Sequence, residues 1–392
     1  MKLLTNIAAL VMSVVLGYFV TIILTSPAGF DPSLTPRPGP VVEAGAENVP
    51  APVDTSSSQP SSTAATTVET YLVWSSGGLT PGLTGALTAE YPEASVVKGD
   101  VVELEVGNGR LIPLDAVAVE PDDHRPFDPT GSLTQLRPGA VVLGATSATL
   151  RDAGPGDFLA MGGKHFEVVG IAPDETIGAA EVVFAASDPD SPVRTDRFVL
   201  IATDTPRTTF EGFVRASYDG PAPLRIRAEG ETPWLRHGDA VAPQVFIKQA
   251  LGEFSYTNRS GSDFIQDDKF LDENIAEFEV PILGSVICHK VVAEMLVGAM
   301  AQLVEEGLAH LVDPAGYRGC WNPRFIRSAS GTPAGVSRHA WGAGVDLNAS
   351  TNPVGSVGTQ DPRLIAVMLD WGFTWGGDWL VPDPMHFELG IP

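Results

Sequence analysis

The stretch SRHAWGAGVDLN at residues 337–348, together with DPMHFE at residues 383–388, determines how the last part of the chain folds. Gly342 and Gly344 allow the backbone to turn tightly ahead of Asp346. Both stretches contain a short strand-like run, so Asp346 is expected to lie within a strand. A carboxylate in a buried strand is costly unless it is paired or bound to a metal. The first stretch therefore indicates a metal site.

A set of two histidines and one aspartate has the composition of a catalytic zinc site. Such sites use three protein ligands from His, Asp or Glu and keep a fourth position for water. His339, Asp346 and His386 supply this set. Asp383, three residues before His386, is placed to act as general base and then as general acid. Glu388 alternates with His386 along the predicted strand, so it either orients a ligand ring or is structural.

The pattern S-x-H-x-x-G-x-x-x-D, followed by W-G-G-D-W and D-x-M-H-F-E, resembles the D-alanyl-D-alanine carboxypeptidase family of zinc peptidases. That family includes vancomycin-resistance D,D-peptidases and phage L-alanyl-D-glutamate endolysins. The resemblance covers about residues 236–392 and is strongest from Arg324 onward. It implies a small α+β domain around an antiparallel sheet. It also implies one Zn²⁺ held by His339, Asp346 and His386.

The resemblance assigns further roles near the metal. Asp383 matches the catalytic carboxylate, and Arg324 takes the place of an arginine that stabilises the substrate carbonyl or binds its carboxylate. Arg327 competes with Arg324 for that role, since either guanidinium offers a fixed donor fork. Ser337 matches a small polar residue before the first ligand. Together with Arg327 and Trp341, it is expected to contact substrate.

The chain has two cysteines, Cys288 and Cys320, and both fall in this region. In an oxidising compartment, two cysteines are expected to form one disulfide, and the alternative is two buried thiols.

Two helices are predicted in this region. An apolar stripe at helical spacing predicts a helix over residues 290–304. Asp-Pro at residues 361–362 begins a second helix, which ends near residue 371.

Residues 69–205 have the sequence pattern of a β-rich domain, with short apolar runs separated by Gly, Pro, Asp and Asn turns. Within it, residues 143–170 resemble the extracellular domains of macrolide-exporter and cell-division ABC permeases. That resemblance implies an interaction module, with a possible protein partner and no catalysis of its own. Residues 206–235 are expected to bridge to the peptidase domain at 236–392.

The N-terminus carries a targeting signal. Residues 3–24 form a mostly apolar run after Lys2, long enough to cross a bilayer, which predicts a transmembrane signal-anchor within residues 1–28. The alternative is a signal peptide cleaved near residues 26–28, which would give a secreted protein. Residues 29–68 are dominated by Pro, Ala, Ser and Thr and are expected to form a disordered linker.

The charge balance limits the partners. The 392 residues include 24 basic and 48 acidic ones, for a net charge of −24, so nucleic acid is excluded as a partner. The expected fold is therefore multidomain: a transmembrane helix, a β-rich domain outside the cytoplasm and a C-terminal α+β zinc-peptidase domain.

The expected function is cleavage of peptidoglycan stem peptides at a bond involving a D-amino acid, by a metal-activated water. The bond would be of the D-Ala-D-Ala or the L-Ala-D-Glu type. Two alternatives come from other classes: a zinc-bearing wall-binding module without catalysis, and a scaffold whose β-rich domain binds a membrane partner.

Overall fold

The computed structural model describes residues 67–235, 241–326 and 335–391. These residues belong to one compact unit that spans Ala64–Pro392. Within the described ranges, no helix combines the length and the apolar character needed to cross a bilayer. The predicted anchor at residues 1–28 and nearly all of the predicted linker at 29–68 lie outside the described residues.

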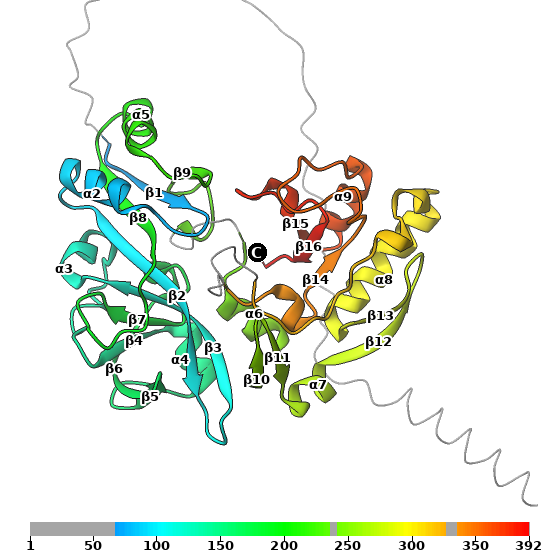
Figure 1. Cartoon of the computed structure of the whole chain (residues 1–392), viewed down its shortest axis with the longest axis horizontal. Coiled ribbons are helices and arrows are strands. Elements are labelled where there is room, and N and C mark those ends of the chain that lie inside the picture. Colours follow the sequence, from blue (N-terminus) through cyan, green and yellow to red (C-terminus); the bar gives the residue numbers. More distant parts are fainter. Residues whose placement is uncertain (1–66, 236–240, 327–334, 392) are drawn as a thin grey trace, which may run out of the picture. The chain divides into compact units, whose positions relative to one another are not determined.

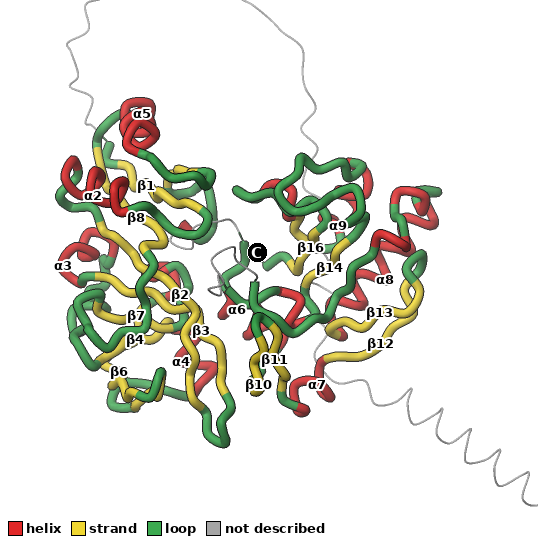
Figure 2. Tube along the Cα trace, in the orientation of Figure 1, coloured by secondary structure: helices red, strands yellow, loops and turns green. Residues whose placement is uncertain are grey.

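The first part of the chain forms the β-rich fold that its sequence predicts, built around a large mixed sheet (Figures 1 and 2). Strand order is β11-β10-β3-β7-β4-β6-β5-β2-β8-β1-β9, and a further pairing joins β3 to β2. That pairing closes β3, β7, β4, β6, β5 and β2 into a ring. The strands are β1 (Glu69–Ser75), β2 (Ser95–Glu105), β3 (Leu111–Val119), β4 (Ala140–Gly144), β5 (Phe158–Met161), β6 (Lys164–Ala172), β7 (Val182–Ala185), β8 (Asp196–Thr203), β9 (Leu224–Ala228), β10 (Tyr256–Ser260) and β11 (Asp263–Gln266).

Alternation along β1 explains how the sheet is covered. Tyr71 and Val73 pack into one apolar cluster with residues of α2 (Pro81–Glu90) and α5 (Arg207–Ser217), whereas Leu72 joins a cluster on the opposite face. The segment 206–235, expected to be a bridge, supplies both α5 and β9, and β9 pairs with β1. The remaining helices here are α3 (Pro121–His124) and α4 (Ala145–Arg151).

The C-terminal region has the predicted α+β composition with a small antiparallel sheet of order β14-β16-β15. Both predicted helices form. α8 is buried along the apolar stripe, and Asp361 caps α9 by accepting a hydrogen bond from the Arg363 amide. A separate hairpin of β12 and β13 lies beside α8 (Figure 1). The elements are α6 (Gln244–Leu251), α7 (Asp268–Asn274), β12 (Ile275–Val280), β13 (Gly284–His289), α8 (Lys290–Glu305), β14 (Gly344–Asp346), α9 (Pro362–Asp370), β15 (Phe373–Trp375) and β16 (His386–Leu389).

A buried charge network joins α6 to the β-rich sheet. Lys248 Nζ lies 2.7 Å from Glu181 Oε2 and 2.9 Å from Glu253 Oε1, and the side chains of Lys248 and Glu181 have no exposed surface. Arg151 Nη2 lies 2.6 Å from both carboxylates, and Gln244 donates to Glu181 Oε1 at 2.7 Å. Burial raises the pKa of Glu181, but Lys248 and Arg151 outweigh it and hold this pKa below its ordinary value. Four charges are thus matched in pairs inside the fold.

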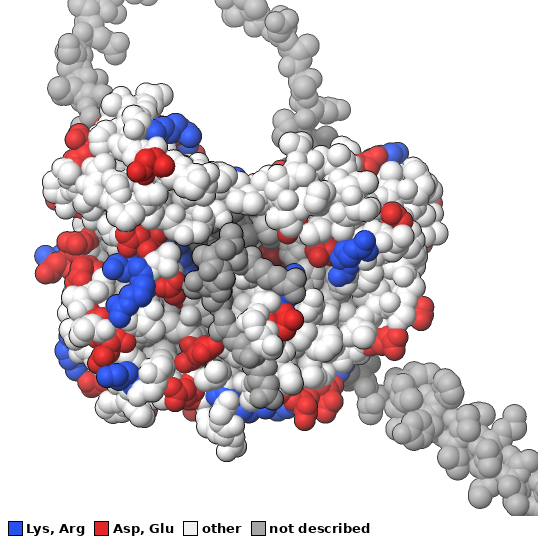
Figure 3. Space-filling model, in the orientation of Figure 1, with Lys and Arg blue, Asp and Glu red and all other residues white. Residues whose placement is uncertain are grey.

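Acidic residues outnumber basic ones by 48 to 24 in the sequence. On the face drawn in Figure 3, acidic side chains are scattered over a mostly uncharged surface, with basic side chains between them. This face offers no continuous basic stripe of the kind that binds nucleic acid.

Candidate metal centre

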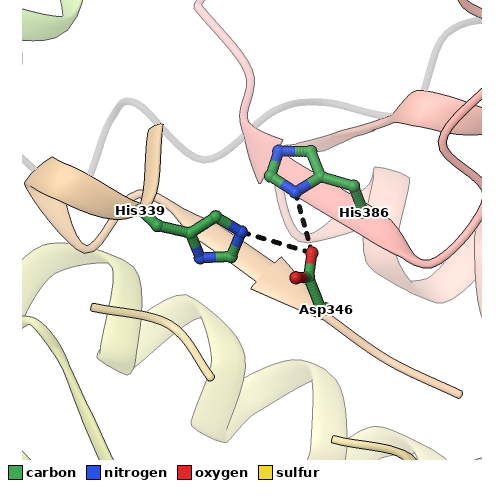
Figure 4. Close-up of side chains that lie close together, drawn as sticks. All are labelled: His339, Asp346 and His386. Atoms are coloured by element: carbon green, nitrogen blue, oxygen red, sulfur yellow. Dashed lines mark hydrogen bonds and ion pairs between the residues drawn. The ribbon is translucent and has the colours of Figure 1, made fainter. Parts of the chain in front are cut away.

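Three side chains from three different elements converge on one point (Figure 4). His339 lies on a short 3-10 turn (Arg338–Trp341), Asp346 ends β14, and His386 begins β16. One ligand atom from each of these residues lies within 4.8 Å of the others, and all three residues are buried. Strand register explains part of this convergence, because Asp346 is directly opposite His386 in the β14–β16 pair.

The hydrogen bonds leave one nitrogen of each imidazole facing Asp346. His339 Nδ1 lies 2.9 Å from the Cys320 carbonyl oxygen, and its Nε2 lies 3.3 Å from Asp346 Oδ1. His386 has the opposite orientation: Nδ1 lies 2.9 Å from Asp346 Oδ1, and Nε2 lies 3.2 Å from Glu388 Oε2. In metal sites, a carbonyl or carboxylate on the outer nitrogen fixes the tautomer and the ring orientation. Both rings have such a partner here.

Two glycines make room for the site. Gly342 has φ +63°, which favours glycine, and a Cβ there would lie 2.5 Å from the backbone nitrogen of His289. A Cβ on Gly344 would lie 2.6 Å from His386 Cε1 and 3.4 Å from His339 Cε1. Gly344 is therefore needed for the space that the two rings occupy.

The pKa values of the ligands in the metal-free site show that it favours an ionised Asp346 next to a positive charge. Burial raises the pKa of Asp346, but the hydrogen bonds from His339 and His386 outweigh it and hold this pKa far below its usual range. Burial lowers the pKa of His386, but Asp346 and Glu388 outweigh it and raise the pKa to about 10. Two nitrogens and one carboxylate oxygen form a donor set that suits a zinc ion.

Asp383 lies beside this site with one oxygen directed into the protein. Its Oδ1 is buried and accepts no hydrogen bond from the described residues. Burial and the nearby charge of Asp346 raise the pKa of Asp383, whereas His386, His339 and Arg324 oppose the rise. Arg324 is half-buried and close enough for its charge to act on Asp383. The sequence therefore identified a carboxylate and an arginine that both lie near the candidate ligands.

The other predicted site residues have different environments. Trp341 is completely buried and donates through Nε1 to the Gly252 carbonyl at 3.1 Å, so it has a packing role in place of the expected substrate contact. Ser337 is also buried, and its amide donates to the Arg324 carbonyl at 3.1 Å. Arg327 lies outside the described residues. The disulfide expected from the two cysteines is present between Cys288 and Cys320.

Sequence reasoning missed two residues next to the ligands. The ring of Trp379 lies 5.4 Å from that of His386, measured between centroids. Arg338 lies 3.7 Å from Glu388 through its Nε. The only signals for them were position: Trp379 closes the W-G-G-D-W motif, and Arg338 precedes the first ligand.

Comparison with known families supports the reading of the C-terminal motifs. Residues 330–389 match a peptidase family model described as D-alanyl-D-alanine carboxypeptidase. This range contains His339, Asp346, Asp383 and His386, so the match supports a peptidase-like function for this part of the chain. That family is zinc-dependent, in agreement with the donor set. No curated protein matches the chain significantly.

Comparison with solved structures finds a second kind of similarity. The chain is similar to the periplasmic region of MacB from Actinobacillus actinomycetemcomitans, with 15% identity, TM-score 0.31, and coverage of 40% of this chain and 87% of that one. It is also similar to a domain of a permease protein from Porphyromonas gingivalis (11%, TM-score 0.27, 41% and 87%). A third similarity is to the extracellular domain of the noncanonic ABC-type transporter YknZ from Gram-positive bacteria (10%, TM-score 0.24, 37% and 87%). Both resemblances seen in the sequence are thus found again.

Proposed function

We propose that this chain is a zinc-dependent peptidase that cleaves peptidoglycan stem peptides at a bond involving a D-amino acid. The observation that carries the proposal is the convergence of His339, Asp346 and His386 on one buried point. The family match over residues 330–389 supports the same chemistry. A D-Ala-D-Ala carboxypeptidase and an L-Ala-D-Glu endopeptidase are the two forms of this activity that the motifs suggest.

The residues around the ligands can carry out the proton transfers. When bound, zinc would supply a Lewis acid that lowers the pKa of a water towards about 7 and polarises the scissile carbonyl. Asp383 would accept the proton of the attacking water and give it to the leaving nitrogen. Its raised pKa suits both steps, because a base that is too acidic takes up a proton poorly. Arg324 would bind the developing negative charge on the carbonyl oxygen or the terminal carboxylate of the peptide.

The expected location fits this substrate. A disulfide indicates an oxidising compartment, and the Cys288–Cys320 bond closes a loop next to the site. A membrane anchor at residues 1–28 would hold the peptidase on the side of the membrane where peptidoglycan lies.

Incubation of the chain from Ala64 to Pro392 with purified muropeptides would test the function. Mass spectrometry of the products would identify the bond. We expect cleavage that a chelator abolishes and zinc restores. Asp383→Asn should abolish cleavage and still bind zinc. Asp378→Asn, which changes an exposed aspartate of the neighbouring 3-10 turn, is the matched control and should leave cleavage intact. Muropeptide binding without any product from the native protein would favour the non-catalytic wall-binding module instead.

A further inference from the structure

We propose that Arg338 is a positioning residue of the metal centre, which acts by fixing Glu388 so that Glu388 holds the His386 imidazole with Nδ1 towards Asp346. This inference rests on the metal site of the proposed function. It concerns metal affinity, so it can be tested without any assay of hydrolysis.

Glu388 is the outer partner of His386. It follows His386 by two positions on β16, so both side chains are on the same face of the strand. Glu388 Oε2 lies 3.2 Å from His386 Nε2, and 3% of the Glu388 side chain is exposed. Its other oxygen, Oε1, is buried and accepts no hydrogen bond from the described residues. A buried carboxylate with an oxygen that accepts no hydrogen bond is costly unless a cation lies nearby.

Arg338 supplies that cation from a fixed position. Its Nε lies 3.7 Å from Glu388 Oε1, and 12% of its side chain is exposed. Its Nη2 donates a hydrogen bond to the carbonyl of Ala242, just before α6. The guanidinium is thus held at one end by the backbone and faces the carboxylate at the other. The planar fork of an arginine suits such a two-sided contact.

Loss of Arg338 should affect the metal through Glu388. Without the guanidinium, Oε1 would lose its neighbouring charge. The buried carboxylate could then lower its free energy by turning towards water. That movement would withdraw Oε2 from His386 Nε2 and free the ring to rotate away from Asp346. A merely structural arginine would lower stability without this specific effect on His386.

A double-mutant cycle on zinc affinity tests the inference. We would measure the zinc Kd by competition with a chromophoric chelator for the native full chain, Arg338→Gln, Glu388→Gln and the double variant. Each single change should weaken zinc binding by about 10–100-fold, the usual effect of removing an outer partner of a ligand. The double variant should bind no more weakly than Glu388→Gln alone, because both act on the same contact. Unchanged affinity in Arg338→Gln, or losses that multiply in the double variant, would overturn the proposal.

Two further measurements separate positioning from loss of fold. Arg363→Gln removes an exposed arginine of α9 that pairs with the N-cap residue Asp361, and it should leave the Kd unchanged. In the zinc-loaded native protein, nitrogen-15 NMR should show His386 protonated at Nε2, and Arg338→Gln should lose that single tautomer. If Arg338→Gln does not fold, Arg338→Lys provides the readout. It keeps the charge without the fork, so its Kd should lie between those of the native protein and Glu388→Gln. A native Kd in Arg338→Lys together with an unchanged His386 signal would contradict the role of the fork.

Discussion

Replacement of Gly344 by alanine should disable the metal centre with a single methyl group. The added Cβ would lie 2.6 Å from His386 Cε1, whereas ordinary van der Waals contact begins at 3.4 Å. The ring would therefore have to withdraw by about 0.8 Å, the difference between these two distances. Ligand distances in metal sites vary by only about 0.2 Å, so His386 could not remain a ligand after such a shift.

The backbone offers little relief from this clash. Gly344 pairs with Glu388, and Asp346 pairs with His386, in the same two strands. A shift of β14 away from His386 would thus carry Asp346 with it and enlarge the site. The φ angle of Gly344 is not in the left-handed region, so alanine is tolerated by the backbone and the clash accounts for the whole effect. We expect zinc affinity to fall by at least about 100-fold, the upper end of the range for changes around a ligand.

Competition with a chromophoric chelator would measure the effect of Gly344→Ala on the zinc Kd. The matched control is Gly212→Ala in α5, where an added Cβ would meet nothing within 4 Å. That control should bind zinc normally and gain up to about 1 kcal/mol of stability, because alanine favours a helix over glycine. A Gly344→Ala protein that binds zinc within twofold of the native one would refute the reasoning.

Four other outcomes follow from the buried groups. The raised His386 pKa means that the metal-free protein holds a proton that the unfolded chain releases, so the contribution of His386 to stability should be complete below pH 6.5 and be lost as the pH rises to about 10, as thermal melts across this range would show. Over the same range zinc should displace that proton, and calorimetry in buffers of different ionisation enthalpy should detect its release. Lys248→Met should cost about 3–5 kcal/mol in chemical denaturation, because it leaves buried carboxylates without their cation, whereas Lys164→Met in an exposed pair should cost less than about 1 kcal/mol. Replacing Cys288 and Cys320 by serine should cost about 2–4 kcal/mol and weaken zinc binding, since the Cys320 carbonyl orients His339.

Local sequence patterns predicted the parts of the fold that depend on local rules. Helical spacing and an Asp-Pro start predicted α8 and α9 to within one or two residues. The strand-like runs around Asp346 and His386 became β14 and β16. The ligand trio was identifiable because metal chemistry restricts the residue types, so three residues far apart in sequence could be grouped by their side chains alone.

Features that depend on long-range packing were not predictable in this way. Trp341 follows the first ligand by two positions, and nothing in that spacing tells whether its ring faces a substrate or Phe254, whose ring centroid lies 4.8 Å away. The position of Arg338 before the first ligand did not reveal its contact either, because its partner Glu388 is fifty residues further along and meets it only in the folded chain. Residues 206–235 contain few apolar runs, yet β9 forms because β1 offers it an open edge.

The buried charges of α6 bear on the role of the β-rich part. Lys248 lies on the C-terminal side of the chain, and its partner Glu181 directly precedes β7 of the β-rich sheet. The sheet also extends across this junction, since Tyr256 of β10 pairs with Leu111 of β3. A fragment beginning at α6 would therefore expose one unpaired edge and leave the Lys248 ammonium without one of its carboxylates. The β-rich part thus contributes to the stability of the region that carries the metal centre, and assays of that region should keep both parts together.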